Sequence, residues 1–469
     1  MHSLSFRSSL APVVYTLAGL LSFATTAAAQ VPDNWAVATR FQGANTLGQL
    51  GGLSLIDLSA PGTATAITGL SAELTGTGLG TEGSASVLVD GRTGNLVIGE
   101  HALPGDTTDI HVLTLAGTTV INDDRYTLGT RPGGIGSVDQ MAWLGDDVLF
   151  SVRGKGITSG IMAGHLLGVL RPRLGPPGTP GTITPVPLTV NPIGTINSLA
   201  LDEKNGFAYF STNQAQVQSD IYRVPVPGDG VTPVAPMHVA TVTAGVLNLI
   251  IEGDGQLLAG CSNWGTGRLL RIDITQPTAS VTPLTASLHN INAMVNDNAT
   301  GNVLVANSAN GAIYSRQANG ALNYLTSLPL TDGFVSGLAI RQTIETYGLP
   351  TPGQNNYEWA LAPNPGGEPS IGNSGFSMTS TASGVTALGL VGLSLAEAPV
   401  NIPILGVSLL LDPTTMVLPT VLLPAPSTTI PLPIPNTASL AGMRIYAQTF
   451  HSEATGWAAS RGLRITLVP

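Results

Sequence analysis

The stretch GTINSLALD, Gly194 to Asp202, has the pattern of a β-strand with one polar residue, Asn197, just ahead of its apolar part. Similar phrases recur along the chain as GSVDQMAWL, GVLNLIIEG, HNINAMVND and GFVSGLAIR. Alignment on the small polar residue brings five residues to one position: Asp139, Asn197, Asn248, Asn292 and Ser336. Their spacing, roughly 44 to 58 residues, is close to the length of one β-propeller blade.

Each phrase is followed by a tight turn and by further strands. After Asp202 the chain continues with the turn DEKNG, the strand FAYFSTN, a third strand in DIYRVPVPG and a more polar fourth strand. Glycine, aspartate and asparagine favour such turns because they tolerate positive φ. Four strands in each unit are typical of a propeller. The sequence therefore predicts an all-β fold with a six-bladed propeller over residues 31–345. Seven blades are the alternative, because the segment 156–190 has room for extra strands.

The two ends of the predicted propeller complete each other. The last phrase, GFVSGLAIR, has no second strand after it, and the N-terminal strands WAVATRF and GGLSLIDLS have no inner strand before them. Pairing of the two ends would complete one blade and remove two exposed edge strands. We therefore expect the ring to be closed by both ends of this region.

The aligned polar residues are expected to line the mouth of the channel. An inner strand that begins at the mouth would place its first side chain in solvent and the following side chains against neighbouring blades. We predict a ligand-binding site there, and the ends of the second strands add further polar groups. Asn263 and Trp264 could hold a sugar or a peptide by stacking and hydrogen bonding. The other second-strand candidates are Glu100, His101, Arg153, Asn213 and Asn307. The alternative is that all of these are ordinary solvated residues.

Two longer stretches, NSLALDEKNGFAYFSTN and NAMVNDNATGNVLVANSANGAIY, resemble blades of secreted bacterial NHL-type and gluconolactonase-type (SMP-30-like) six-bladed propellers. This resemblance implies one divalent cation at the mouth, held by carboxylate and amide oxygens of the kind that suit Ca²⁺. The candidate metal ligands are Asp139, Asn197, Asn248 and Asn292. Only one of them is a carboxylate, and the nearby Glu82 and Glu100 are out of register. Two functions stay open: a non-enzymatic binding or scaffold protein, and a divalent-metal-dependent lactonase-like hydrolase.

Other catalytic signatures are absent from the sequence. It contains no H-E-x-x-H, no G-x-S-x-G and no pair of cysteines for zinc. Three of the seven histidines, His101, His111 and His165, are expected in different blades and show no ligand spacing. Cys261 is the only cysteine, so no disulfide can form within the chain, and its apolar strand predicts a buried thiol.

The composition changes after the propeller region. The prolines and glycines of YGLPTPGQNNY, Tyr347 to Tyr357, predict a linker over residues 346–357. The apolar run TALGLVGLSLAEAPVNIPILGVSLLL is interrupted by a glutamate and prolines, which favours short strands over a membrane helix. The run IPLPIPNTASLAGMRIYAQTF and the closing SRGLRITLVP resemble a C-terminal β-sandwich module of secreted environmental bacteria. That resemblance covers residues 358–469 and implies a surface-association role.

Charge and the N-terminus indicate the surroundings in which the chain works. Its net charge is −10 with only 18 Lys and Arg residues, which disfavours nucleic acid as a partner. An apolar run followed by the A-x-A pattern of TTAAAQ predicts a signal peptide over residues 1–29. We therefore expect a secreted protein, periplasmic or extracellular, with no transmembrane segment once the peptide is removed. The expected partner is a small molecule, a glycan or a protein at the mouth.

Overall fold

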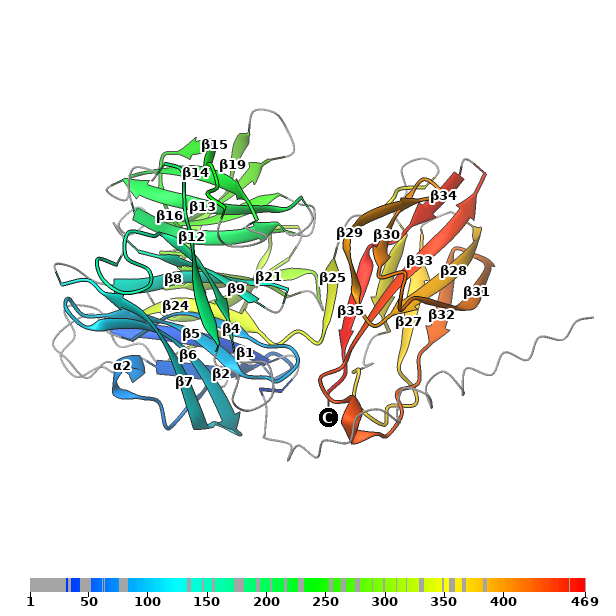
Figure 1. The fold of residues 1–469 in the computed structure, drawn as a ribbon, viewed down its shortest axis with the longest axis horizontal. Coiled ribbons are helices and arrows are strands. Elements are labelled where there is room, and N and C mark those ends of the chain that lie inside the picture. The colour runs from blue at the N-terminus through cyan, green and yellow to red at the C-terminus, as the bar shows by residue number, and fades with distance from the viewer. Residues whose placement is uncertain are drawn as a thin grey trace, which may run out of the picture. The chain divides into compact units, whose positions relative to one another are not determined.

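The computed structural model describes residues 31–468 except 33–34, 43–51, 61, 63, 76–82, 133–135, 146, 154–156, 173–180, 191–194, 203–204, 215–216, 227–231, 253–255, 263–266, 275–278, 289, 298–299, 309, 318, 329–332, 348–349, 354–358, 365–367, 383–385 and 455. The signal peptide predicted over residues 1–29 therefore lies outside the described residues. The described chain forms two compact units, one ending at Gln342 and the other beginning at Thr343. Both units are built almost entirely of β-strands (Figure 1).

The N-terminal unit consists of four-stranded antiparallel meanders, as the repeated sequence phrases predict. Two of them are formed by the strands β4 (Gly83–Val89), β5 (Leu96–Ala102), β6 (Thr107–Ala116) and β7 (Thr119–Thr130), and by β8 (Gly136–Leu144), β9 (Asp147–Val152), β10 (Leu167–Arg171) and β11 (Thr182–Val186). The segment 156–190, where extra strands were possible, supplies β10 and β11 of the second meander.

Three further meanders follow in chain order. Their strands are β12 (Thr195–Asp202), β13 (Phe207–Gln214), β14 (Gln218–Pro225) and β15 (Met237–Val242); β16 (Gly245–Ile251), β17 (Leu257–Ser262), β18 (Gly267–Asp273) and β19 (Ser280–Leu288); and β20 (Ala293–Asp297), β21 (Asn302–Asn307), β22 (Ala312–Arg316) and β23 (Leu322–Ser327). In each of them, neighbouring strands along the chain are also neighbours in the sheet. A short helix, α2 (Ala72–Thr75), precedes β4.

The remaining meander joins the two ends of the N-terminal unit. Strand β24 (Gly333–Ile340) pairs with β1 (Trp35–Gln42), which continues into β2 (Gly52–Asp57) and β3 (Ala64–Ala66). In Figure 1 the yellow β24 lies beside the blue N-terminal strands. The predicted completion of one sheet by both ends is confirmed, and the described strands fall into six meanders.

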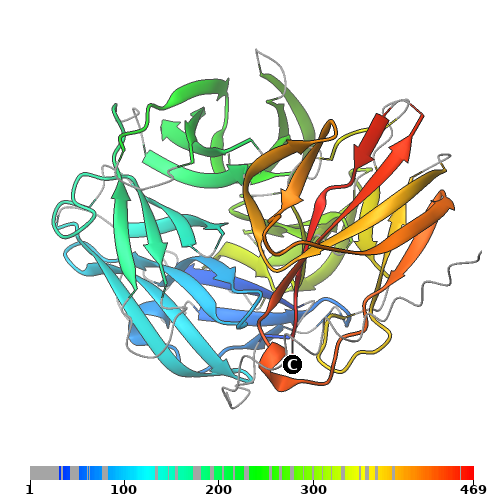
Figure 2. The same ribbon diagram turned by 45° about the vertical axis from the view of Figure 1, so that its right-hand side comes forward.

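The first strands of the meanders succeed one another in space. Figure 2 follows the sheets from blue through cyan and green to yellow. The contacts run from β4 to β8, β12, β16, β20 and β24, and β24 also contacts β4. These contacts form a closed ring of first strands, which is the arrangement that defines a propeller.

Apolar side chains fill the space between consecutive meanders. One cluster combines Tyr209 and Ile221 of one sheet with Leu249 and Leu257 of the next. Because side chains alternate between the two faces of a strand, each sheet contributes to the clusters on both of its sides. The apolar strand cores are therefore accounted for by burial between sheets.

The tight turns after the first strands have the predicted backbone. Gly206, between β12 and β13, has φ 69°, and Gly301, between β20 and β21, has φ 72°. Such angles strain residues that carry a Cβ atom. The glycine at each turn is therefore a local requirement that the sequence reveals directly.

The C-terminal unit contains two main sheets and a hairpin. The larger sheet is formed by β25 (Ile344–Tyr347), β35 (Gly462–Thr466), β33 (Arg444–Glu453), β28 (Ala387–Ser394), β31 (Val417–Ala425) and β34 (Gly456–Ala459). The smaller sheet is formed by β26 (Ala360–Pro363), β27 (Ser377–Thr381) and β32 (Ser427–Pro431), and the hairpin by β29 (Glu397–Ile404) and β30 (Val407–Leu411). A short 3-10 helix, η2 (Ala438–Leu440), precedes β33.

One apolar cluster contains residues of both main sheets. It includes Leu361 and Met378 of the smaller sheet and Val391 and Ile465 of the larger. The run that could have been a membrane helix forms β28, β29 and β30, so the prediction of short strands is confirmed. Among the described residues, no helix is long and apolar enough to cross a membrane.

The boundary between the units differs from the predicted linker. Residues Ile344 to Tyr347 form β25, which pairs with β35 near the end of the chain. The hydroxyl group of Tyr347 also donates a hydrogen bond of 3.1 Å to the carbonyl oxygen of Leu410. The C-terminal unit thus begins before residue 358. The reason is that this long-range pairing converts a segment without a repeat signature into an edge strand.

A buried histidine in the C-terminal unit predicts a loss of stability in acid. His451 is 2% exposed, and its ring stacks on Trp359 with 3.4 Å between centroids and 6° between planes. Burial lowers the pKa of His451 from 6.5 to about 4. Between these two values the unfolded chain binds a proton that the folded chain does not. The free energy of unfolding should therefore fall by about 3 kcal/mol as the pH drops from 7 to 4.

Urea unfolding of the wild type and of His451→Phe at several pH values measures this effect. Phenylalanine keeps a stackable ring but does not titrate, so the variant should lack this part of the acid destabilisation. Other acidic and basic groups contribute equally to both proteins. Identical pH profiles for the two proteins would show that His451 does not carry the effect.

Candidate functional site

The first strands carry a β-bulge at the position of the aligned residues. In five meanders the register skips one residue at the corresponding place of the first strand. The skipped residues are Ala85, Asp139, Asn197, Leu247 and Ser336. In the remaining meander, Asn292 directly precedes the first pair of β20. Bulges re-aim side chains and are common next to functional sites.

Asn248 lies one residue out of phase with the others. In β16, Val246 pairs with Cys261 and Asn248 pairs with Gly260, so Leu247 is the bulge residue. The sequence alignment had matched Asn248 to Asp139 and Asn197 by its polarity. The hydrogen-bond register, which the sequence does not show, instead places Leu247 at the position that Asp139 and Asn197 occupy in their strands.

Three of the predicted mouth residues are buried and do not face solvent as expected. Asn197 is 6% exposed, Asn248 3% and Ser336 6%. Ser336 donates to the carbonyl oxygen of Ser84 at 2.6 Å and lies 2.9 Å from Oγ1 of Thr39. The close contact between first strands leaves these side chains in the wall of the ring.

The carboxamide oxygens of three asparagines are buried without a hydrogen-bond partner among the described residues. They belong to Asn197, Asn248 and Asn292. Asn292 is half-buried. A buried acceptor that makes no hydrogen bond costs about 1–3 kcal/mol. These three carboxamide oxygens of the first-strand region are therefore candidate hydrogen-bond acceptors for a ligand.

Asp139, the single carboxylate of the predicted set, is held by its neighbours. Its Oδ2 atom lies 3.2 Å from Nε of Arg153, and Ser137 donates a hydrogen bond to its Oδ1 atom. Arg153 also donates to Nε2 of His101 at 3.3 Å. The four side chains connect the ends of β5, β8 and β9. Asp139 is thus charge-compensated and poorly suited to serve as the anionic ligand of a calcium ion.

The second-strand candidates are placed only in part. Asn263 and Trp264 lie outside the described residues, as does Glu82, and the side chain of Asn213 is not described. Glu100 is 3% exposed and His101 is 2% exposed, so neither lies on an open rim. Asn307 is also buried. Arg153, with 36% of its side chain exposed, is accessible.

Sequence reasoning missed a cluster of three ionisable side chains. Glu100 of β5 and Asp109 and His111 of β6 bring one ligand atom each within 4.8 Å of one another. Burial raises the pKa of Glu100 to about 8, against the opposing hydrogen bond from the backbone N–H of Asp109. His101 and His111 were expected in different blades, but β5 and β6 belong to the same meander. The available signal was the alternation of Asp109 and His111, which places both on one face of a strand.

Cys261 is an inert thiol. It is fully buried in β17, as its sequence predicted, and burial raises its pKa to about 12. The thiolate form, which is the reactive one, is therefore negligible at neutral pH.

Comparisons with known proteins find distant structural likenesses. No family model and no curated protein matches the chain. Some solved structures do match, at low similarity. A 6-phosphogluconolactonase-like protein from Bacteroides fragilis is 12% identical, with a TM-score of 0.37, covering 65% of this chain and 98% of that one. A similar protein from Bacteroides uniformis is 12% identical, with a TM-score of 0.38, covering 85% and 100%.

A quinoprotein alcohol dehydrogenase-like protein from Bacteroides thetaiotaomicron is 11% identical. Its TM-score is 0.38, and the match covers 65% of this chain and 78% of the other. Likenesses of this degree accompany many unrelated activities, because one fold hosts many functions. The function must therefore be argued from the residues of this chain.

Proposed function

We propose that this protein is a secreted, non-enzymatic propeller that binds a small hydroxyl-bearing molecule at the ring of first strands. The observation that carries the proposal is the set of buried carboxamide oxygens of Asn197, Asn248 and Asn292, which accept no hydrogen bond from the described residues. Asn197 is the bulge residue of β12, Asn248 follows the bulge residue of β16, and Asn292 directly precedes the first pair of β20. Because these oxygens are buried in the free protein, a ligand would have to enter between the first strands, where its hydroxyl groups would supply the missing donors.

The charges near the ring favour a neutral ligand. Arg153 compensates Asp139, and the asparagines carry no charge. Amide side chains both donate and accept hydrogen bonds, which suits the hydroxyl groups of a sugar. A monosaccharide is therefore the ligand class that this donor and acceptor set fits best.

The same geometry disfavours hydrolysis. A lactonase of the gluconolactonase type would need a cation with an anionic ligand and an acid or base beside it. Asp139 is engaged by Arg153 and Ser137, and its aligned neighbours are amides. These side chains can form hydrogen bonds to a ligand but offer no free acid or base for hydrolysis, so we favour binding without turnover.

Replacement of Asn197 by leucine should weaken binding while stabilising the free protein. Leucine is tolerated at this register, because Leu247 occupies it in β16. Removal of the unpartnered acceptor should raise the free energy of unfolding of the ligand-free protein by about 1 kcal/mol. The same change should weaken sugar binding at least tenfold, which corresponds to about 1.4 kcal/mol.

Calorimetric titration with glucose, galactose and arabinose measures the affinity, and urea unfolding measures the stability. Asn323→Leu, on the exposed outer strand β23, is the matched control and should change neither quantity. Equal affinities for Asn197→Leu and the control would contradict the proposed site. Turnover of glucono-δ-lactone that Ca²⁺ supports and EDTA abolishes would replace binding by the hydrolase function.

The C-terminal unit is proposed to attach the protein to a surface. Fractionation of cells and medium, with and without residues 343–469, tests this role. The full chain should be retained with the cells and the shortened chain should be released. An unchanged distribution would remove the attachment role and leave the sugar-binding proposal intact.

A further inference from the structure

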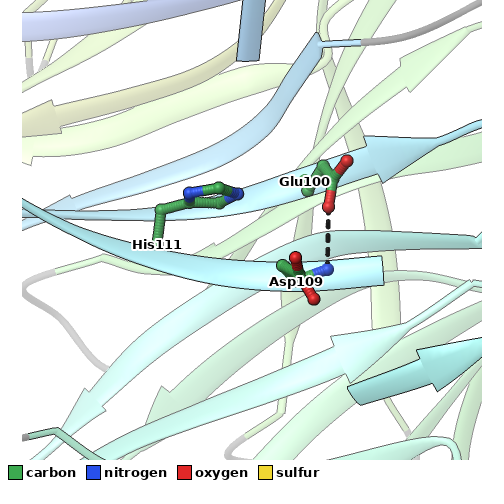
Figure 3. Close-up of side chains that lie close together, drawn as sticks. All are labelled: Glu100, Asp109 and His111. Carbon is green, nitrogen blue, oxygen red and sulfur yellow. Dashed lines mark hydrogen bonds between the residues drawn. The ribbon is translucent and has the colours of Figure 1, made fainter. Parts of the chain in front are cut away.

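Three ionisable side chains meet in the meander formed by β4, β5, β6 and β7. Glu100 projects from β5, and Asp109 and His111 project from the adjacent β6 (Figure 3). Their exposed fractions are 3%, 5% and 0%, so all three are shielded from solvent. One oxygen of Glu100 accepts the backbone N–H of Asp109 at 2.8 Å, which fixes the glutamate beside the aspartate.

Two atoms of this cluster are left without a hydrogen bond. They are Nε2 of His111 and Oδ1 of Asp109, and both are buried with no partner among the described residues. Buried polar atoms are almost always satisfied, so each exception requires an explanation. An imidazole nitrogen and a carboxylate oxygen with lone pairs available are the kinds of atom that bind a metal ion.

The opposite edge of the His111 ring is held as it is in many metal sites. Its Nδ1 atom lies 2.9 Å from Oδ1 of Asp123 and 3.2 Å from Oδ2 of the same residue. A carboxylate that accepts the Nδ1 proton leaves the lone pair on Nε2 and fixes the orientation of the ring. Asp123, on β7, would thus position the histidine without touching the ion.

The charges of the cluster also favour a cation. Glu100 and Asp109 are two acids that share a buried site, and like charges at such a distance repel strongly when water is excluded. Arg125 of β7 is already engaged, with Nη1 3.2 Å from Glu73 and Nε 3.4 Å from Asp123. A divalent ion would neutralise both carboxylates at once.

We propose that Glu100, Asp109 and His111 form a buried site for a divalent transition-metal ion, with zinc as the best-fitting metal. One imidazole nitrogen and two carboxylate oxygens are ordinary ligands of zinc, whereas calcium prefers oxygen ligands alone. The site shares no residue with the predicted calcium ligands Asp139, Asn197, Asn248 and Asn292. It does not depend on the proposed sugar binding.

Zinc titration of the full chain, after dialysis against EDTA and then against metal-free buffer, tests the site. Calorimetry and elemental analysis should give one zinc per chain, and Ca²⁺ should not compete. Co²⁺ added in place of zinc should produce the visible d–d bands of a site with nitrogen and oxygen ligands. Absence of stoichiometric zinc from folded wild-type protein would overturn the proposal, and a proton shared by the two acids would then explain the cluster.

Variants assign the metal to these residues. Asp109→Asn keeps the shape of the side chain and should remove stoichiometric zinc, as should His111→Gln. Asp123→Asn should weaken zinc binding by about 10–100-fold, because it loosens the histidine without removing a ligand. Circular dichroism of the metal-free variants identifies those that fold. If His111→Gln does not fold, the Asp109→Asn and Asp123→Asn results decide.

Two controls separate this site from incidental binding. Glu252→Gln alters another buried acid, and His238→Gln alters a half-exposed histidine that lies 3.5 Å from Asp220. Both should retain one zinc per chain. Zinc binding that survives Asp109→Asn and disappears in His238→Gln would place the metal at the surface and refute the buried site.

Discussion

Replacement of Glu252 by alanine should lower the free energy of unfolding of the propeller unit by about 3–5 kcal/mol. Glu252 is 9% exposed and lies 2.9 Å from Nη1 of Arg316 and 2.8 Å from Nε of Arg271. Arg316 is itself buried at 4% exposure. Alanine would leave its guanidinium group without this carboxylate in a region of low dielectric, and breaking a buried ion pair from one side has such a cost.

Urea unfolding followed by circular dichroism measures this effect. Asp147→Ala is the matched control, because Asp147 pairs with Arg171 at 3.2 Å while their side chains are 30% and 57% exposed. The free energy of unfolding of this variant should fall by less than about 1 kcal/mol. Similar losses for the two variants would show that burial does not set the strength of the Glu252 pair.

The second large effect is expected where the two ends of the propeller meet. Ala38 of β1 is fully buried and pairs with Leu338 of β24. Both belong to a cluster that also contains Val335 of β24 and Ala293 of β20. Aspartate at position 38 would place an unpaired charge in this cluster, at a cost of about 4 kcal/mol or more. Most of the propeller unit of this variant should therefore be unfolded already, so its cooperative unfolding transition on heating should be largely absent.

Calorimetric unfolding compares this variant with Ala116→Asp, which introduces the same charge at the exposed end of β6. The control should unfold as the wild type does. A wild-type transition in Ala38→Asp would mean that the junction of β1 and β24 contributes little to the stability of the ring.

Local sequence was sufficient for the repeated architecture. A short apolar strand, a glycine turn and a second strand recur in contiguous segments, so the meanders could be predicted one at a time. The joining of β24 to β1 could also be predicted, because each end lacked the strands that the other supplied. The strands β28, β29 and β30 followed from the prolines and the glutamate that interrupt an apolar run.

Register and solvent access were not available from the sequence. Asn248 resembles Asn197 in its surroundings along the chain, yet Leu247 is the residue at the bulge of β16. The mouth residues were expected in solvent, but packing of the first strands against one another buries Asn197, Asn248 and Ser336. A single strand does not reveal how closely its neighbours in the ring approach.

By itself, the sequence determined which segments become strands, where they turn, and that both ends of the propeller region share a sheet. These features depend on side-chain alternation and on glycine geometry, which act between residues close in the chain. The tertiary structure alone decided that Glu100, Asp109 and His111 share one buried space and that Asp139 is compensated by Arg153. Burial and charge pairing depend on side chains brought together from different strands, and that is why the candidate metal site emerged only from the folded chain.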